Sequence, residues 1–230
     1  MGEDRIKRKV QDIVSRGGAF PQGSQIIQCL RSICKYFETS QRLSRLRNIQ
    51  DINHGSMGAP ILDGKTRVAS CHRLLQSSIL HFWIMQKYYE SVSNSGDDFK
   101  GIWEALNSSD WQLIQEMEAI IKDLARYALG GSQTDNSLPS EILIYRKVSM
   151  GVLQRQSFHL LPLSRHDQGT TLEDLEQTRK NDGTKKELID LSANEKICLE
   201  RIKGQIRSRF VDAEEPKPFK PLFLDPRTVP

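Results

Sequence analysis

The sequence has few cysteines and none at metal-binding spacing. Its four cysteines, Cys29, Cys34, Cys71 and Cys198, form no C-x-x-C motif, and none stands at zinc spacing from a histidine. We expect all four to be reduced core thiols of an intracellular protein. The sequence therefore predicts no metal site and no cofactor.

Long apolar runs are also missing. The longest apolar stretch, LLQSSILHFWIMQ at 74–86, is interrupted by glutamine, serine and histidine, whereas a bilayer span needs about 20 apolar residues. Residues 1–16 are charged and lack the apolar core of a secretory signal. We therefore expect no membrane partner. Hydrophobic residues are only 37% of the 230, which predicts a limited core or a long solvated stretch.

No recognisable catalytic motif occurs. There is no Gly-rich phosphate loop and no G-x-S-x-G, and the five histidines stand in unrelated contexts. Glu116 and Glu118 do not face one another on a helix, because residues i and i+2 point to different sides. His81 lies in an apolar helix, which favours an interior or interfacial histidine over a ligand. The sequence predicts no catalytic residue and no small-molecule substrate.

Helical periodicity is the main positive signal. Apolar residues recur at spacings of three and four in 24–38, in the long segment from about 66 to 91, in 108–131 and in 192–210, and more weakly in 138–150. The expected fold is mainly α: an irregular multi-helix domain with a terminal strand-like segment, at residues 220–224.

Capping residues predict where these helices begin and end. Ser24 is the expected N-cap of the first helix, and the pairs Ser109–Gln112 and Ser192–Glu195 have the spacing of capping boxes. The pair Gly130–Gly131 is expected to end the helix 108–131 in a left-handed turn.

The two longest helices are expected to pack together and form the core. Trp83 and Trp111 fall on apolar stripes and are expected in the core, whereas Trp103 is consistent with either a core residue or an exposed stacking platform. The expected contact between the helices buries the residues Leu75, Ile79, Phe82, Ile114, Met117, Ile121 and Leu124.

Shifts in composition divide the chain into four parts. Residues 1–23 are a basic segment and a loop, 24–150 are a helical domain, 151–190 are a polar linker, and 191–230 hold a basic helix and a strand-turn. The linker interpretation follows from many charges and few large apolar residues, which predict an exposed connection with at most a helical turn.

Basic residues gather around one predicted loop. The net charge of +4 is compatible with nucleic acid or with an ordinary solvated surface. Clustered arginines are suited to phosphate contacts, since each is a bidentate donor; the alternative is a solvated rim of helix ends. The predicted DNA-contacting residues are Arg42, Arg45, Arg47, Lys65, Arg67 and Arg73.

Four stretches, in this order, resemble hAT-superfamily (hobo/Activator/Tam3-like) transposases. They are TSQRLSRLRNIQ at 39–50, DGKTRVASCHRLLQSSI at 63–79, SDWQLIQEMEAIIKDLARYAL at 109–129 and LFLDPRT at 222–228. In the family, a T-R-W helix, an E-W helix and an L-L-D-P-R strand-turn follow in that order. Here Val68 stands where the family usually has Trp, and the usual proline near Leu124 is absent.

The resemblance implies a helical insertion domain within an RNase H-like core. In the family two catalytic acidic residues precede this region and a glutamate follows it, and no position in this chain matches any of the three. The zinc-finger pattern and the dimerisation segment of the family are also absent. By resemblance, the chain associates with DNA, is nuclear, and does not catalyse on its own.

Two functions of different classes remain open from the sequence. The first is a fragment or domesticated remnant of a hAT-type transposase, associated with DNA but catalytically incomplete, with self-association as a further expectation. The second is a stand-alone helical protein–protein interaction domain that does not bind DNA. An intact transposase would need acidic ligands that the sequence lacks.

Overall fold

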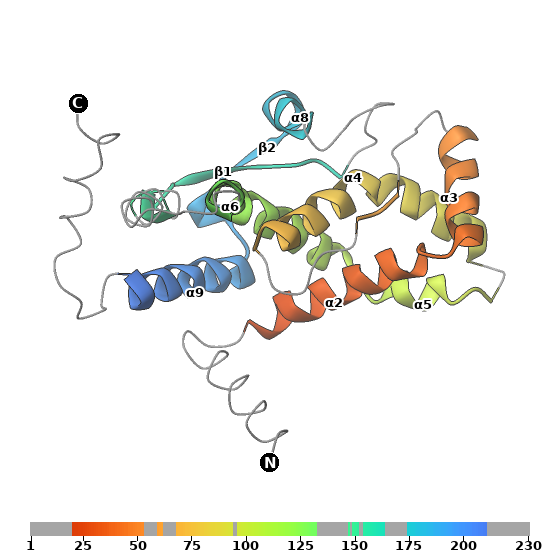
Figure 1. Ribbon diagram of the computed structural model, residues 1–230, viewed down its shortest axis with the longest axis horizontal. Helices are drawn as coiled ribbons and strands as arrows, with labels where there is room; N and C mark the ends of the chain where they lie inside the picture. Colours follow the sequence, from red (N-terminus) through yellow and green to blue (C-terminus); the bar gives the residue numbers. More distant parts are fainter. Residues whose placement is uncertain are drawn as a thin grey trace, which may run out of the picture.

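The computed structural model describes residues 20–52, 59–61, 68–93, 96–132, 147, 149–151, 154–163 and 174–210. Most of these residues are helical, which confirms the predicted mainly α fold (Figure 1). The elements in chain order are α2 (Pro21–Tyr36), α3 (Ser40–Ile52), α4 (Val68–Val92), α5 (Phe99–Glu104), α6 (Ser108–Ser132), β1 (Ser157–Leu160), α8 (Leu175–Asp182), β2 (Thr184–Glu187), the 3-10 helix η1 (Leu188–Asp190) and α9 (Ala193–Phe210).

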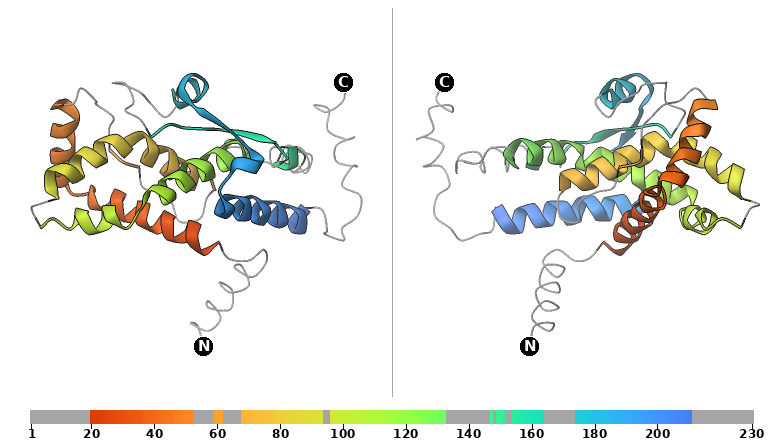
Figure 2. Two further views of the ribbon diagram at one scale, coloured as in Figure 1. Left: turned by 180° about the vertical axis from the view of Figure 1, so that it is seen from behind. Right: turned by 45° about the vertical axis from the view of Figure 1, so that its right-hand side comes forward.

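The long helices α4 and α6 form the centre of the molecule. The two strands and α8 lie on one side of them and α2, α5 and α9 on the other, and the same order is visible from behind in Figure 2. The predicted packing of the two helices is confirmed: Leu75, Ile79, Ile114 and Met117 are buried in the main core cluster. Phe82, Ile121 and Leu124 lie partly buried at the edges of the core.

Helix α2 begins earlier than predicted. The expected cap Ser24 lies inside the helix, which starts at Pro21 after Phe20. Proline suits the first helical position because its fixed φ is helical and its missing N–H has no partner there. The predicted apolar stripe is confirmed, since Ile26 and Leu30 are buried, as are Ile33 and Phe37.

The cap of α6 is also shifted along the chain. Asn107 Oδ1 accepts hydrogen bonds from the backbone N–H groups of Ser109 at 2.8 Å and Asp110 at 3.1 Å, and Asp110 Oδ2 accepts one from the Asn107 N–H at 3.0 Å. This reciprocal pair is the capping box, two residues before the predicted one at Ser109 and Gln112. The helix then runs through Gly130 and Gly131 to Ser132, so the predicted glycine stop was wrong.

The polar stretch 151–190 contains regular structure instead of the expected exposed connection. β1 and β2 pair antiparallel, with Ser157 opposite Glu187 and Leu160 opposite Thr184. Phe158 and Leu175 are buried, and β1 packs against α6. Few apolar residues suffice here because α6 already supplies the other side of the interface.

Helix α9 follows the prediction closely. Ser192 Oγ accepts a hydrogen bond from the Glu195 N–H at 3.2 Å, which confirms Ser192 as the cap, and Cys198 is buried. The other half of the predicted capping box was wrong, because the Ser192 N–H donates to Glu116 and not to Glu195. Of the predicted helix 138–150, only residues 147 and 149–150 are described, and they are helical. The strand-like segment at 220–224 lies outside the described residues. Among the described helices, none is both long and apolar enough to cross a membrane.

Trp103 belongs to the core rather than to an exposed platform. Its ring stacks on Phe99, with centroids 5.9 Å apart, and lies 5.4 Å from the ring of Trp111. Both tryptophans are buried. Trp83, also expected in the core, is half-buried against it.

Candidate nucleic-acid interface

Three of the six predicted DNA-contacting residues lie on α3. Arg45 and Arg47 are exposed, and neither forms a hydrogen bond or ion pair within the described part of the chain; Arg42 is half-buried. Lys65 and Arg67 lie outside the described residues. The described candidates on α3 therefore include two arginines available to a partner.

Packing against α4 orients α3. Leu46 and Gln50 are buried, and Leu43 and Ile49 are partly buried against the main core. Figure 1 shows α3 upright across one end of the molecule, beside the later part of α4. The opposite face of α3 consequently points away from the body of the protein.

Arg42 has a structural partner that limits its use as a ligand contact. Its guanidinium lies 4.0 Å from the centroid of the Tyr36 ring, and Nη1 donates a hydrogen bond to the Tyr36 carbonyl at 3.4 Å. Tyr36 Oη in turn donates to Asp97 Oδ1 at 2.5 Å. Burial would raise the pKa of Asp97, but the bonds from Tyr36 and the Phe99 N–H, with the charges of Arg42 and Arg45, hold that pKa below its ordinary value.

The structure separates Arg73 from the arginines of α3. Arg42 lies near Tyr88 of α4, because it packs on the ring of Tyr36 and the hydroxyl of Tyr36 is hydrogen-bonded to Tyr88 Oη at 3.0 Å. Tyr88 follows Arg73 by 15 residues on α4, which corresponds to about 22 Å along the helix axis. Arg73 is exposed, but it cannot share a small binding surface with Arg42.

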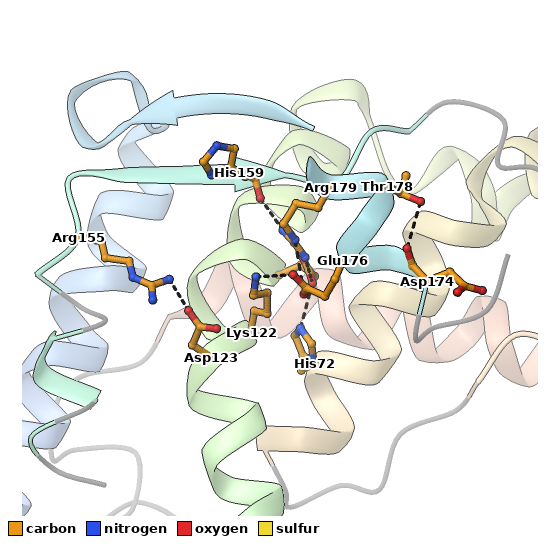
Figure 3. A network of polar contacts seen from close by, with 10 residues as sticks. His72, Lys122, Asp123, Arg155, His159, Asp174, Glu176, Thr178 and Arg179 are labelled. Carbon is orange, nitrogen blue, oxygen red and sulfur yellow. Dashed lines mark hydrogen bonds and ion pairs between the residues drawn. The ribbon is translucent and has the colours of Figure 1, made fainter. Parts of the chain in front are cut away.

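A second polar cluster, which the sequence did not predict as a unit, lies between α4, α6, α8 and β1. Arg179 Nη2 donates to both carboxylate oxygens of Glu118 at 2.6 and 2.8 Å, and Nη1 donates to the His159 carbonyl at 2.5 Å (Figure 3). His72 Nε2 donates to Glu118 Oε1 at 2.9 Å. Burial would raise the pKa of Glu118, but His72 and Arg179 outweigh it and hold the pKa below its ordinary value.

Glu116 ties the C-terminal elements to the opposite side of α6. Its Oε1 accepts from Lys186 Nζ at 2.7 Å and from Gln112 Nε2 at 2.9 Å, and its Oε2 accepts from Ser192 Oγ at 2.6 Å. The Ser192 N–H also donates to Oε2, at 3.3 Å. Glu116 therefore occupies the position that Glu195 would take in a complete capping box, at the positive end of the α9 dipole.

Displaced from that role, the Glu195 side chain is buried and accepts no hydrogen bond from the described part of the chain. Neither of its carboxylate oxygens is hydrogen-bonded within the described residues, and the side chain is fully buried. Burial, and then the charge of Glu116, raise the pKa of Glu195 well above its ordinary value. Glu195 is therefore the one carboxyl of this cluster that the fold favours in its neutral form.

These carboxylates stabilise the fold rather than form an open reaction site. Glu116 and Glu118 hold different partners on different sides of α6, which confirms that they do not face one another. Both are fully buried. Among the described histidines, cysteines and carboxylates, no three are grouped so as to hold a metal ion.

The remaining candidates from the sequence have structural surroundings. His81 is buried, and its Nδ1 donates to the Ser77 carbonyl at 2.7 Å, as expected for an interior histidine. The four cysteines are unbridged, but only Cys34 and Cys198 are buried, while Cys29 and Cys71 are half-buried.

Comparisons with known protein families, with curated proteins and with solved structures find no match. The hAT resemblance therefore continues to depend on the four motifs alone.

Sequence reasoning missed the cluster around Glu118 because its members are far apart in the chain. His72 and Arg179 lie 46 and 61 residues from Glu118. One signal was present: Glu118 follows Ile114 by four residues on the apolar stripe of α6. A charged residue at such a position requires a buried partner.

Proposed function

We propose that the chain is a helical domain of hAT transposase type, a fragment or domesticated remnant, that associates with DNA and has no catalytic centre of its own. The order of the four motifs supports the family, and the helical fold is compatible with its insertion domain. The buried carboxylates Glu116 and Glu118 do not supply an open reaction site, because their described neighbours occupy them.

One observation carries the DNA proposal. Arg45 and Arg47 are both exposed on α3 and both lack an ion pair within the described residues. Some surface cations have acidic partners, such as Lys87 with Glu90 and Lys185 with Glu187, each at 2.7 Å. Arg73 and Lys100 resemble Arg45 and Arg47 in forming no ion pair within the described residues, but they do not share one helix face. Unpaired arginines on one helix are suited to phosphate oxygens, which give DNA binding most of its non-specific affinity.

Fluorescence anisotropy with a labelled duplex tests this proposal. The variant Arg45→Ala/Arg47→Ala should bind any duplex more weakly than the unaltered chain. The matched control is Arg126→Ala/Lys180→Ala, which removes the same charge from exposed positions on α6 and α8 and should retain most of the affinity. Equal losses in the two variants would mean that only net charge matters, and would remove α3 as the interface.

A protein–protein interaction domain is the second candidate, and one surface favours it. A groove of about 410 Å³ lies between η1 and α9, lined among others by Leu188, Ile189 and Leu199. Ile189 is 79% exposed and supplies apolar surface at the edge of this groove. This candidate predicts no binding to DNA at low salt, and a loss of partner binding in Ile189→Asp.

A further inference from the structure

We propose that α3 is a recognition helix that reads base edges in the major groove of duplex DNA. This inference rests on the proposed DNA association and goes beyond it, because it assigns sequence-specific contacts to named residues. It starts from the composition of the exposed face of α3, which differs from an ordinary solvated surface.

The exposed face of α3 carries side chains suited to base edges. With about 100° per residue, five residues fall within an arc of about 100°: Gln41, Ser44, Arg45, Asn48 and Ile52. All five are exposed. Arginine pairs with the O6 and N7 atoms of guanine, asparagine and glutamine with N6 and N7 of adenine, serine with either, and an apolar side chain with the thymine methyl. The face contains no lysine and no acidic residue.

Two further arginines flank this face at equal angles. On the same wheel Arg42 lies about 60° beyond one edge of the arc, where its guanidinium packs on Tyr36. Arg47 lies about 60° beyond the other edge, and the exposed Asp51 lies between it and the face, about 20° from that edge. A helix lying in a groove presents such flanking positions to the phosphates, and the exposed Arg47 is the expected phosphate contact. Asp51 is the only acidic residue on α3, which carries three arginines. The net charge of this helix is therefore +2, which favours contact with the phosphates of DNA.

The dimensions of α3 fit the major groove. An α-helix with its side chains is about 10–12 Å across, and the groove is about 12 Å wide. The 13 residues of α3 extend about 20 Å, which covers roughly six base pairs at 3.4 Å each. Since α3 stands at one end of the described structure (Figure 2), its outer face can approach a duplex.

Selection of bound duplexes from a random library tests the proposal, with the full chain as bait. The expected result is an enriched site of about four to six base pairs. Asn48→Ala and Arg45→Ala should each lower the discrimination at one position of that site by about 5- to 150-fold. Arg47→Ala should weaken binding to all sequences about equally, as expected of a phosphate contact. Arg126→Ala, far from α3, serves as the control.

The outcomes separate this inference from the function on which it rests. Salt-dependent binding without an enriched site would overturn the recognition helix and leave DNA association intact. An enriched site that Asn48→Ala and Arg45→Ala leave unchanged would place the reading surface elsewhere and overturn the inference. Preference for single strands over duplexes would overturn it too. Absence of any binding would overturn both proposals.

Discussion

Replacing Arg179 by methionine tests whether the buried cluster around Glu118 holds the C-terminal elements on the helical core. The side chains of Arg179 and Glu118 are 5% and 0% exposed, so water cannot take over when one partner is removed. Breaking such a pair leaves a buried carboxylate that retains the hydrogen bond from His72 but loses its guanidinium partner, and the loss costs about 3–5 kcal/mol. Native domains have only about 5–15 kcal/mol of total stability, so the substitution should remove a large fraction of it.

Urea unfolding followed by circular dichroism measures this change. The Arg179→Met variant should unfold at much lower urea than the unaltered chain. The double variant Glu118→Met/Arg179→Met should be more stable than Arg179→Met alone, since it removes the stranded charge along with its partner. The matched control is Lys122→Met, which breaks a partly exposed pair with Glu176 and should cost at most about 1 kcal/mol.

A small effect would refute the reasoning. If Arg179→Met costs less than about 1 kcal/mol, Glu118 is either solvated or protonated in the native state, and the cluster does not stabilise the fold. If the double variant is the least stable of the set, the pair contributes net stability, and removal of a stranded charge is not the dominant effect.

Three further predictions follow from single features. The Glu195→Gln variant should be more stable than the unaltered chain at pH 7 and equal to it below pH 4.5. The pKa of Glu195 in the native state is raised above its ordinary value of 4.5. Above pH 4.5 the native state of the unaltered chain therefore binds more protons than its unfolded state, and its stability falls as pH rises. A stability difference that does not change with pH would contradict this. Met117→Ala should cost about 2–5 kcal/mol in chemical unfolding because the side chain is buried in the main core; a change within about 0.5 kcal/mol would mean that it faces solvent. Asn107→Ala should lower the free energy of unfolding by about 1 kcal/mol, because it removes the cap of α6, and Ser109→Ala should lower it much less. A larger loss in Ser109→Ala would mean that Ser109 is the cap.

Periodic helices were the part of the fold that the sequence could predict. The stripe through Ile114 and Met117 and the cap at Ser192 depend on neighbours three or four residues away, and such local rules can be read from one chain. Helix starts were less predictable. Ser24 and Ser109 are good capping residues, but α2 begins earlier, at Pro21, and Asn107 caps α6.

Long-range partners could not be predicted in the same way. Residues 151–190 are polar, so their pairing into strands depends on burial against α6, which no local pattern contains. The same holds for Arg179, whose partner lies 61 residues away. For the candidate interface, the sequence indicated the arginines of α3 but grouped them with Arg73 because these residues are close in sequence. The grouping does not hold, since α4 carries Arg73 away from α3.

The salt dependence of duplex binding tests the central claim most directly. Affinity should fall linearly with salt on logarithmic axes, with a slope of about −0.9 for each phosphate contacted. Removing the phosphate contact of Arg47 should make the slope of the Arg45→Ala/Arg47→Ala variant shallower by about 0.9 units, and by about 1.8 units if Arg45 also contacts a phosphate instead of a base edge. A slope equal to that of the unaltered chain, or no measurable binding by the unaltered chain at low salt, would contradict DNA association through α3.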